Sequence, residues 1–331
     1  MATCLALSDH HHAHAAADHV ERPARLDAVT AVLKAAPLWT QVQHLTPVAA
    51  PLEVARLVHT EAYVARLEDA ATAAPLRLDP DTYMTPESLR VALEAVGGAL
   101  AVTDRVLTGD ATNGFVAVRP PGHHATPTQP MGFCLLSTVA LAVRWAQQTH
   151  GLERAMVLDY DVHHGNGTQD VFYADPNVLV VNLHQHPLYP FSGTAEERGQ
   201  GPGVGATLNV PLPAHQGDAV YLDVLRRQVA PAVEAFQPEV IFVSAGFDAH
   251  WRDPLGSMRL TTAGFAALIT EALGWADRHC GGRLIGALEG GYDTEALACG
   301  VRSTVQRLLD PEAAVYDTVG PPPASGTASE T

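Results

Sequence analysis

The chain has 331 residues, enough for one large α/β domain or two smaller ones, and its 47% of hydrophobic residues can fill a sizeable core. The 17% of charged residues excludes a disordered or fibrous protein, and a net charge of -16 disfavours nucleic acid and is compatible with a cationic substrate. Four scattered cysteines predict no disulfide framework and a cytoplasmic location, and we expect neither a secretory signal nor a membrane span.

Apolar runs and helical periodicity alternate along the chain. The runs predict strands at 114–118, 155–158, 178–183, 207–210, 240–245 and 284–288. The periodicity predicts helices at 52–71, 87–107, 136–149, 218–236, 261–279 and 294–309. This alternation predicts a single α/β domain, residues 1–316, with a mostly parallel central sheet and helices on both faces. The Pro-rich, small and polar remainder, 317–331, is expected to be a disordered tail.

Polar motifs follow four of the predicted strands. They are PPGHH, DYDVHHGNG, GFDAH and EGGY. Because active sites of such sheets lie at the carboxyl ends of the strands, we expect these four loops to meet at one edge.

A metal site is the most specific prediction. Asp161 and His163 occupy alternate positions at a strand end, so both can face one ion, and Asp248 can supply a third ligand from another strand. Two carboxylates and one imidazole, with a position left for water, suit a catalytic zinc ion. The alternative interpretation is a set of loop residues that cap helices.

Two adjacent histidines, His123 and His124, suit proton transfer because imidazole titrates near neutral pH. Asp159 and Asn166 on the neighbouring loop could orient the two rings and give them different basicities. The alternative is a surface turn with solvated imidazoles.

The turn EGGY carries Tyr292, whose phenol could donate a hydrogen bond to a developing oxyanion. Gly132-Phe133 and Phe191 could form the aromatic walls of a narrow channel. The alternatives are a tyrosine packed on the surface and phenylalanines of an ordinary core.

Together, RPPGHHA, MGFC, DYDVHHGNGT, SAGFDAH and EGGY resemble the histone deacetylase family, which includes bacterial amidohydrolases and acetylpolyamine amidohydrolases. HVERPARL resembles the family's H-P-E-x-P-x-R-L element, with Val20 in place of Pro. Matching segments run from His10 to about Leu309, and EGGY and Asn166 resemble the class II branch. The resemblance implies an arginase/deacetylase-like fold and one Zn²⁺ per chain. It also implies hydrolysis of the acyl amide of an acyl-lysine or a similar amine, which releases a carboxylate and a free amine.

The resemblance also implies roles for individual residues. The zinc ligands would be Asp161, His163 and Asp248. His124 would be general base and then acid, His123 its electrostatic partner, and Tyr292 the oxyanion donor, with Asp159 and Asn166 orienting the two histidines. Phe133 and Phe191 would line an acyl-lysine tunnel, and Arg25 would lie by an internal exit cavity. A structural K⁺ site would use Asp159, Asp161, His163, Asn182 and Leu183, with Asn182 replacing the family's usual Ser.

Substrate choice depends on Leu255, which stands where the family has its tunnel-mouth gatekeeper. Polyamine-preferring eukaryotic members resemble this pattern with a Glu there, which can pair with a distal ammonium. Leu255 therefore predicts a preference for acyl-lysine peptides, although Asp79 or Asp81 could supply charge at the rim. Acetylpolyamine hydrolysis is the alternative function.

Two further alternatives belong to other classes. A binuclear manganese hydrolase needs extra bridging carboxylates, but Gly165 and His250 stand at the two positions concerned. A non-catalytic acyl-lysine binding protein would have lost a ligand, a histidine or Tyr292, and none is lost. The histidines from His10 to His14 predict an adventitious metal-binding cluster without a catalytic role. The sequence does not indicate an oligomeric state.

Overall fold

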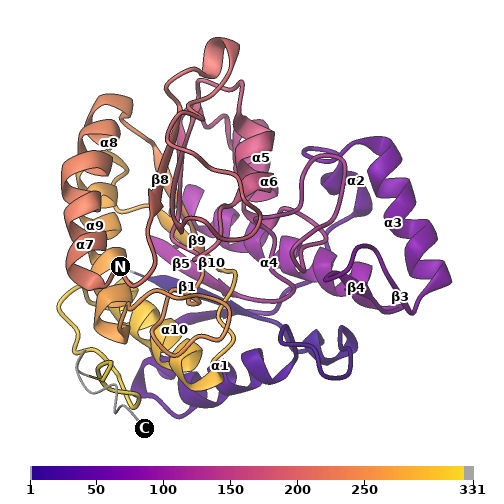
Figure 1. Ribbon diagram of the computed structural model, residues 1–331, viewed down its shortest axis with the longest axis horizontal. Coiled ribbons are helices and arrows are strands. Elements are labelled where there is room, and N and C mark those ends of the chain that lie inside the picture. The colour runs from indigo at the N-terminus through magenta and orange to yellow at the C-terminus, as the bar shows by residue number, and fades with distance from the viewer. Residues whose placement is uncertain (1, 324–331) are drawn as a thin grey trace, which may run out of the picture.

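The computed structural model describes residues 2–323, which are arranged around an eight-stranded sheet with strand order β2-β1-β5-β10-β9-β6-β7-β8 (Figure 1). Every pair of neighbouring strands in this sheet is parallel. The strands are β1 Thr3–Leu7, β2 Gln43–Leu45, β5 Asn113–Ala117, β6 Ala155–Asp159, β7 Val178–Gln185, β8 Thr207–Leu212, β9 Val240–Ala245 and β10 Leu284–Leu288. A separate antiparallel pair is formed by β3 Leu76–Arg77 and β4 Tyr83–Met84.

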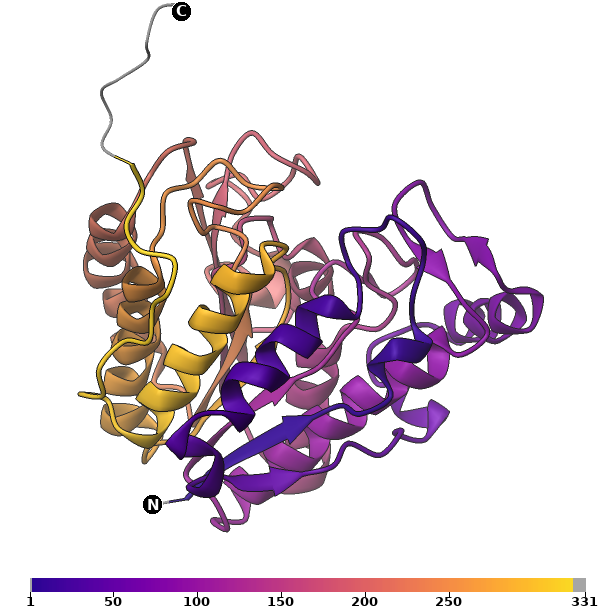
Figure 2. The ribbon, with the colours of Figure 1, turned by 90° about the horizontal axis from the view of Figure 1, so that it is seen from below.

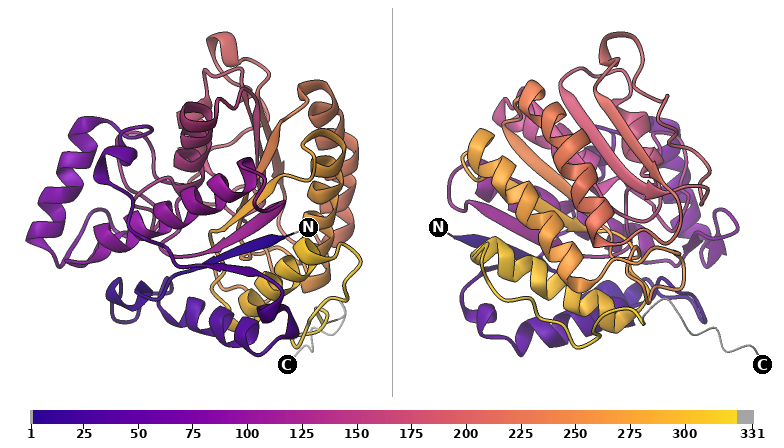
Figure 3. Two further views of the ribbon diagram at one scale, coloured as in Figure 1. Left: turned by 180° about the vertical axis from the view of Figure 1, so that it is seen from behind. Right: turned by 60° about the vertical axis from the view of Figure 1, so that its left-hand side comes forward.

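Helices cover both faces of the sheet, as Figures 1 and 3 show. One face carries α1 Ala24–Lys34, α7 Asp218–Val224, α8 Ala230–Phe236, α9 Thr262–His279 and α10 Thr294–Leu309. The other carries α4 Ser88–Leu107, α5 Thr138–His150 and α6 Asn166–Phe172, with α2 Leu52–Ala55 and α3 Glu61–Ala73 extending beyond it. On the first face, α1 and α10 lie side by side, although they come from opposite parts of the chain (Figure 2). The predicted single α/β domain with a parallel central sheet is confirmed.

All six predicted strands occur, and two of the predicted helices are interrupted. The helix expected at 52–71 divides into α2 and α3 because Thr60 starts a new helix, its side chain accepting a hydrogen bond from Tyr63 N. His59, buried between the two helices, holds the turn through Thr126 O and Ser137 N. The helix expected at 218–236 continues through a π-helical segment, Leu225–Val229, just before Pro231, which has no N–H to donate.

The tail predicted to begin at Asp317 hydrogen-bonds to the domain in its first part. Trp251 Nε1 donates to Gly320 O at 3.1 Å, and Arg259 donates to Pro323 O at 2.9 Å. The rest of that predicted tail, residues 324–331, lies outside the described residues. Its disorder stays a prediction.

The centre of the sheet brings the polar motifs together. β5, β10, β9 and β6 are successive neighbours, and all four end at the same edge. PPGHH follows β5, DYDVHHGNG begins at the end of β6, GFDAH follows β9 and EGGY follows β10. The convergence expected from the strand ends is therefore present, although these four motifs come from widely separated parts of the chain.

Candidate active site

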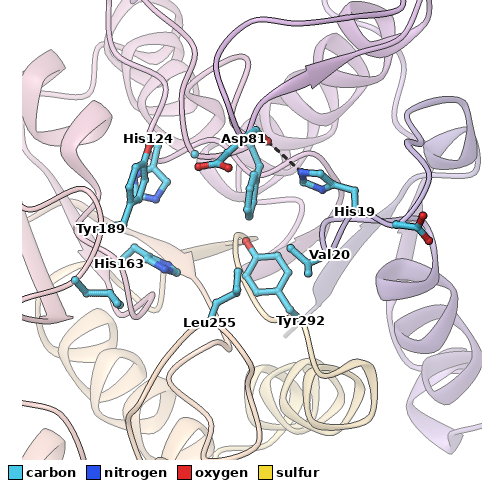
Figure 4. A pocket seen from close by; sticks show the side chains of 12 residues that line it. His19, Val20, Asp81, His124, His163, Tyr189, Leu255 and Tyr292 are labelled. Carbon is cyan, nitrogen blue, oxygen red and sulfur yellow. Dashed lines mark hydrogen bonds between the residues drawn. The ribbon is translucent and has the colours of Figure 1, made fainter.

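The loops at this edge surround a pocket of about 430 Å³ (Figure 4). His124, His163 and Tyr292 point into it, and exposed residues of two other loops, Asp18 and Asp81, stand at its rim. The lining residues are Asp18, His19, Val20, Asp81, His124, Gly132, Phe133, His163, Leu188, Tyr189, Leu255 and Tyr292. Two histidines and a tyrosine that could act as catalytic groups thus meet apolar and aromatic side chains in one concave site, as is typical of small-molecule sites.

The three predicted metal ligands converge. Asp161, His163 and Asp248 each offer an atom within 4.8 Å of the other two. His163 Nδ1 lies 3.1 Å from Asp161 Oδ1 and 3.2 Å from Asp248 Oδ2. Backbone amides fix the carboxylates, since Gly290 N donates to Asp161 Oδ2 and Val162 N donates to Asp248 Oδ1.

This group fits a divalent ion by chemistry as well as by distance. Asp248 Oδ2 is buried and has no hydrogen-bond partner among the described residues. Burial and the neighbouring charge of Asp161 raise the pKa of Asp248 to about 6. Burial opposes protonation of His163, but the neighbouring carboxylates of Asp161 and Asp248 raise its pKa to about 10. Two buried carboxylates that repel each other, with one imidazole between them, form a donor set that a cation stabilises.

The histidine pair is oriented as the sequence predicts. His123 Nδ1 donates to Asp159 Oδ2 at 2.9 Å, and His124 Nδ1 lies 2.8 Å from Asn166 Oδ1. A histidine whose Nδ1 carries the hydrogen has its lone pair on Nε2 when neutral, so His124 can accept a proton there.

The environments of the two rings differ in charge. Burial lowers the pKa of His124, as do the neighbouring His123 and His163, and the result lies well below the usual value. Burial also opposes the charged form of His123, but Asp161 and Asp159 outweigh it and raise its pKa well above the usual value. The surroundings therefore favour the neutral form of His124 and the charged form of His123.

The walls of the pocket are partly as predicted. Phe133 lines it and meets Tyr292 edge to face, with ring centroids 5.7 Å apart. Gly132 adopts a left-handed φ of +55° directly against the His124 ring, where a Cβ would collide.

Phe191 does not line the pocket: it is 73% exposed and lies outside the set of lining residues. Tyr189 forms this wall instead, with its ring centroid 5.4 Å from that of His124. The placement of Phe191 in the wall was wrong because the Tyr189-Pro190-Phe191 segment turns at the wall, and the earlier aromatic residue faces inward. The sequence does contain an indication of the correct wall residue, because Tyr189 is an aromatic residue two positions before Phe191 and directly before a proline.

Two buried acids that the sequence interpretation gave no role hold the loops together. Glu289 accepts hydrogen bonds from Gly122 N at 2.6 Å and His123 N at 3.1 Å, which anchors the PPGHH turn. Asp253 accepts from Tyr292 N at 2.6 Å and Leu255 N at 3.0 Å, so one carboxylate positions two pocket residues. Burial raises the pKa of each carboxyl group to about 7.

The remaining predicted residues lie near the site. Leu255 lines the pocket. Arg25 is buried, donates to Gly291 O and Glu289 O, and places its guanidinium 4.8 Å from the centre of the Tyr292 ring. Asn182 and Leu183 are buried in β7, where Asn182 pairs in register with Asp159. The potassium ion itself stays a prediction.

Gly246 provides a test of how closely the metal ligands are packed. A Cβ at this position would collide with the Asp161 carboxylate, so we expect Gly246→Ala to displace this predicted ligand and to lower the affinity for the predicted zinc ion roughly tenfold or more. Gly274→Ala is the matched control, because only an Arg278 side-chain atom, at 3.6 Å, lies near the added methyl group. Competition with a zinc chelator measures both affinities, and equal affinities would contradict the packing argument.

Comparisons with known proteins agree with this geometry. The histone deacetylase domain family matches residues 19–308. A histone deacetylase-like amidohydrolase of Pseudomonas aeruginosa is 39% identical over 92% of this chain and 80% of its own length. A probable deacetylase of Archaeoglobus fulgidus is 44% identical over 76% of this chain and 69% of its own length.

Two further matches extend the comparison. The chloroplastic histone deacetylase 14 of Arabidopsis thaliana is 41% identical over 76% of this chain, and the match spans only 62% of that relative's length. The crystal structure of the HDA15 HD domain superposes with a TM-score of 0.88 at 33% identity and covers 93% of this chain and 89% of that one. The fold and the arrangement of the site are those of deacetylase-type proteins. The chain belongs to the histone deacetylase family.

No helix within residues 2–323 is long and apolar enough to cross a membrane. All four cysteines are free and buried.

Proposed function

We propose that this protein is a zinc-dependent deacetylase that removes acetyl or other acyl groups from the side-chain amine of acyl-lysine. The observation that carries the proposal is the Asp161, His163 and Asp248 group, which adjoins a pocket shared by His124 and Tyr292. A bound zinc ion supplies Lewis-acid polarisation of the amide carbonyl and a more acidic water.

The residues of the chain divide the remaining chemistry. His124 Nε2 takes a proton from the attacking water and later returns it to the leaving amine, as general base and then acid. His123, held by Asp159, stabilises negative charge that develops next to it. Burial raises the pKa of Tyr292 well above its usual value, so its hydroxyl stays protonated and can donate to the carbonyl oxygen as that oxygen becomes negative.

The pocket walls favour a long, apolar stem. Phe133, Tyr189 and Leu255 provide apolar contact for the methylenes of lysine, while its amide reaches the catalytic groups. His124 and Tyr292 line the pocket, and Asp159 and Asn166 contact the two histidines, which favours an enzyme over a non-catalytic acyl-lysine binding protein.

An acetylpolyamine substrate remains the second candidate because of the rim. Asp81, one of the two acids proposed to supply charge there, is exposed and lines the pocket together with Asp18. Asp79 instead holds its own turn by accepting from Asp81 N at 2.8 Å and Thr82 N at 2.5 Å. Two carboxylates at the mouth can attract a distal ammonium, although exposed charges contribute little each.

Kinetic profiling tests the proposal directly. Purified, zinc-loaded protein is assayed with acetyl-lysine peptides, longer acyl-lysine peptides and acetylpolyamines, each with and without a chelator. We expect chelator-sensitive release of carboxylate, with the highest kcat/KM for an acyl-lysine peptide. Turnover that a chelator leaves unchanged would contradict zinc dependence. No turnover of any amide by the zinc-loaded protein would favour the binding protein.

Leu255→Glu tests the gatekeeper argument. Leu255 is half-buried in the pocket, so a carboxylate there would pair with a distal ammonium in a partly desolvated setting, where ion pairs contribute more than at the surface. We expect the ratio of kcat/KM for acetylspermidine to kcat/KM for an acetyl-lysine peptide to rise about threefold to tenfold.

Leu255→Gln is the control, because it has the shape of the Glu variant without its charge. An equal rise in both variants would show that polarity or shape, not charge, sets the preference. If the wild-type protein already prefers an acetylpolyamine to every peptide tested, the gatekeeper argument is wrong, and the acids at the rim become the better explanation.

A further inference from the structure

We infer that His11, His12 and Asp27 form a second divalent-metal site, separate from the catalytic group and built on the loop that leads to the pocket. Among the described residues, two groups of three metal-ligating side chains place their ligand atoms within 4.8 Å of one another, and this is the second. The two histidines lie in a short 3₁₀ helix, His11–Ala13, and Asp27 lies in the first turn of α1.

The hydrogen bonding of His11 points to a ligand. Its Nδ1 lies 2.9 Å from Ser8 O, and because a carbonyl oxygen only accepts, Nδ1 carries the hydrogen. The neutral ring then has its lone pair on Nε2, which lies 3.1 Å from Asp27 Oδ1. A lone pair facing a carboxylate oxygen is repulsive unless a proton or a cation lies between them. Histidines that ligate metals commonly donate their other nitrogen to a carbonyl in this way.

The spacing of the ligand atoms suits a small ion. His12 Nε2 lies 2.8 Å from the same Asp27 oxygen, and the two imidazole centroids are 4.4 Å apart. Ligands at 2.0–2.1 Å from a tetrahedral zinc ion stand roughly 3.3 Å from each other, close to these separations. His11 is buried, whereas His12 and Asp27 are exposed, so water can complete the coordination.

Two imidazoles and one carboxylate select the class of ion. Imidazole suits Zn²⁺, Cu²⁺ and Ni²⁺, whereas Mg²⁺ and Ca²⁺ prefer oxygen ligands throughout.

The loop that carries the histidines is already anchored by the buried Arg119, whose guanidinium donates hydrogen bonds to His11 O and His14 O. The same loop continues to Asp18 and Val20 in the pocket lining. An ion bound at this site would therefore link the loop that contributes Asp18 and Val20 to the pocket with helix α1.

Isothermal titration of ZnCl₂ into the zinc-loaded protein tests the inference without using activity. We expect the wild-type protein to bind one further ion, and His12→Ala and Asp27→Asn each to weaken this binding at least tenfold. Both substituted side chains are exposed, so the fold is expected to persist, and a thermal melt checks this for each variant. His10→Ala is the matched control: His10 lies in the same loop but pairs with Glu94 at 3.2 Å.

A second readout separates this site from general binding to the surface. Excess ZnCl₂ should raise the thermal midpoint of the wild-type and His10→Ala proteins more than that of His12→Ala, because an ion that binds only the folded state stabilises it. The inference is overturned if no further ion binds, if Asp27→Asn binds as tightly as the wild type, or if His10→Ala removes the binding. None of these outcomes depends on whether the protein hydrolyses amides.

Discussion

Replacing Asp248 by alanine is expected to remove the proposed catalytic zinc and nearly all of the proposed deacetylase activity. The ligand set consists of three side chains, so losing one leaves Asp161 and His163 to hold the ion alone. The loss of an ion that polarises the carbonyl removes several kcal/mol of transition-state stabilisation, about 10³-fold or more in rate. Zinc per chain, measured by elemental analysis after dialysis, and turnover of an acetyl-lysine peptide are the two measurements.

The zinc content per chain must be measured in a protein that lacks the proposed second metal site of His11, His12 and Asp27. Asp248→Ala is therefore made in His12→Ala protein, where the expected content falls from one ion per chain to none. Asp223→Ala in the same background is the control, since Asp223 is an exposed acid on α7 that pairs with Arg227. Stoichiometric zinc and normal turnover in the Asp248 variant would eliminate the proposed catalytic site. Inhibition of the parent protein by a hydroxamate, which chelates such an ion, is expected as well.

The sheet was predictable where strands are long apolar runs, and less so at the end that β2 and β1 form. All six predicted strands occur, since runs such as VLVVNL and VIFVSA are rich in β-branched residues and buried on both faces. β1 was missed because TCLAL is short and has no valine or isoleucine. Helix α1 was missed although Leu26, Val29 and Leu33 carry a helical period.

The residues of the site were predictable where they belong to short sequence motifs. Asp161 and His163 are two positions apart and stay close in the bend that follows β6, where His163 N donates to Asp161 Oδ1. Tyr189 and Phe191 could not be separated this way, because backbone turns within the segment decide which ring enters the pocket. Glu289 was present in EGGY, but its role depends on a contact 167 residues away along the chain, with Gly122 N.

Tyr292→Phe is expected to lower kcat by about 10²–10³-fold, as the loss of one oxyanion donor does elsewhere. The change removes one oxygen from a ring whose position is set by other contacts. Asp253 accepts a hydrogen bond from Tyr292 N, the Phe133 ring packs edge to face against the phenol ring, and the Arg25 guanidinium lies over that ring. In Figure 4 the hydroxyl of Tyr292 points into the pocket, toward the side on which His163 lies. The ring of the phenylalanine variant is therefore expected to keep its place, with KM and zinc content little changed.

A loss confined to kcat separates an oxyanion donor from a structural residue. Tyr173→Phe is the control, because it removes a phenol that lies outside the lining of the pocket, and its kcat is expected to match that of the wild type. Tyr189 carries the other phenol in the lining, so Tyr189→Phe asks whether that hydroxyl is the donor instead. A Tyr292→Phe protein with unchanged kcat/KM, beside a Tyr189→Phe protein that loses two orders of magnitude, would move the oxyanion contact to Tyr189. The reverse pattern, with the zinc content equal in both variants, is the expected result, since burial and the charges of Asp248 and Asp161 raise the pKa of Tyr292 and keep its hydroxyl protonated.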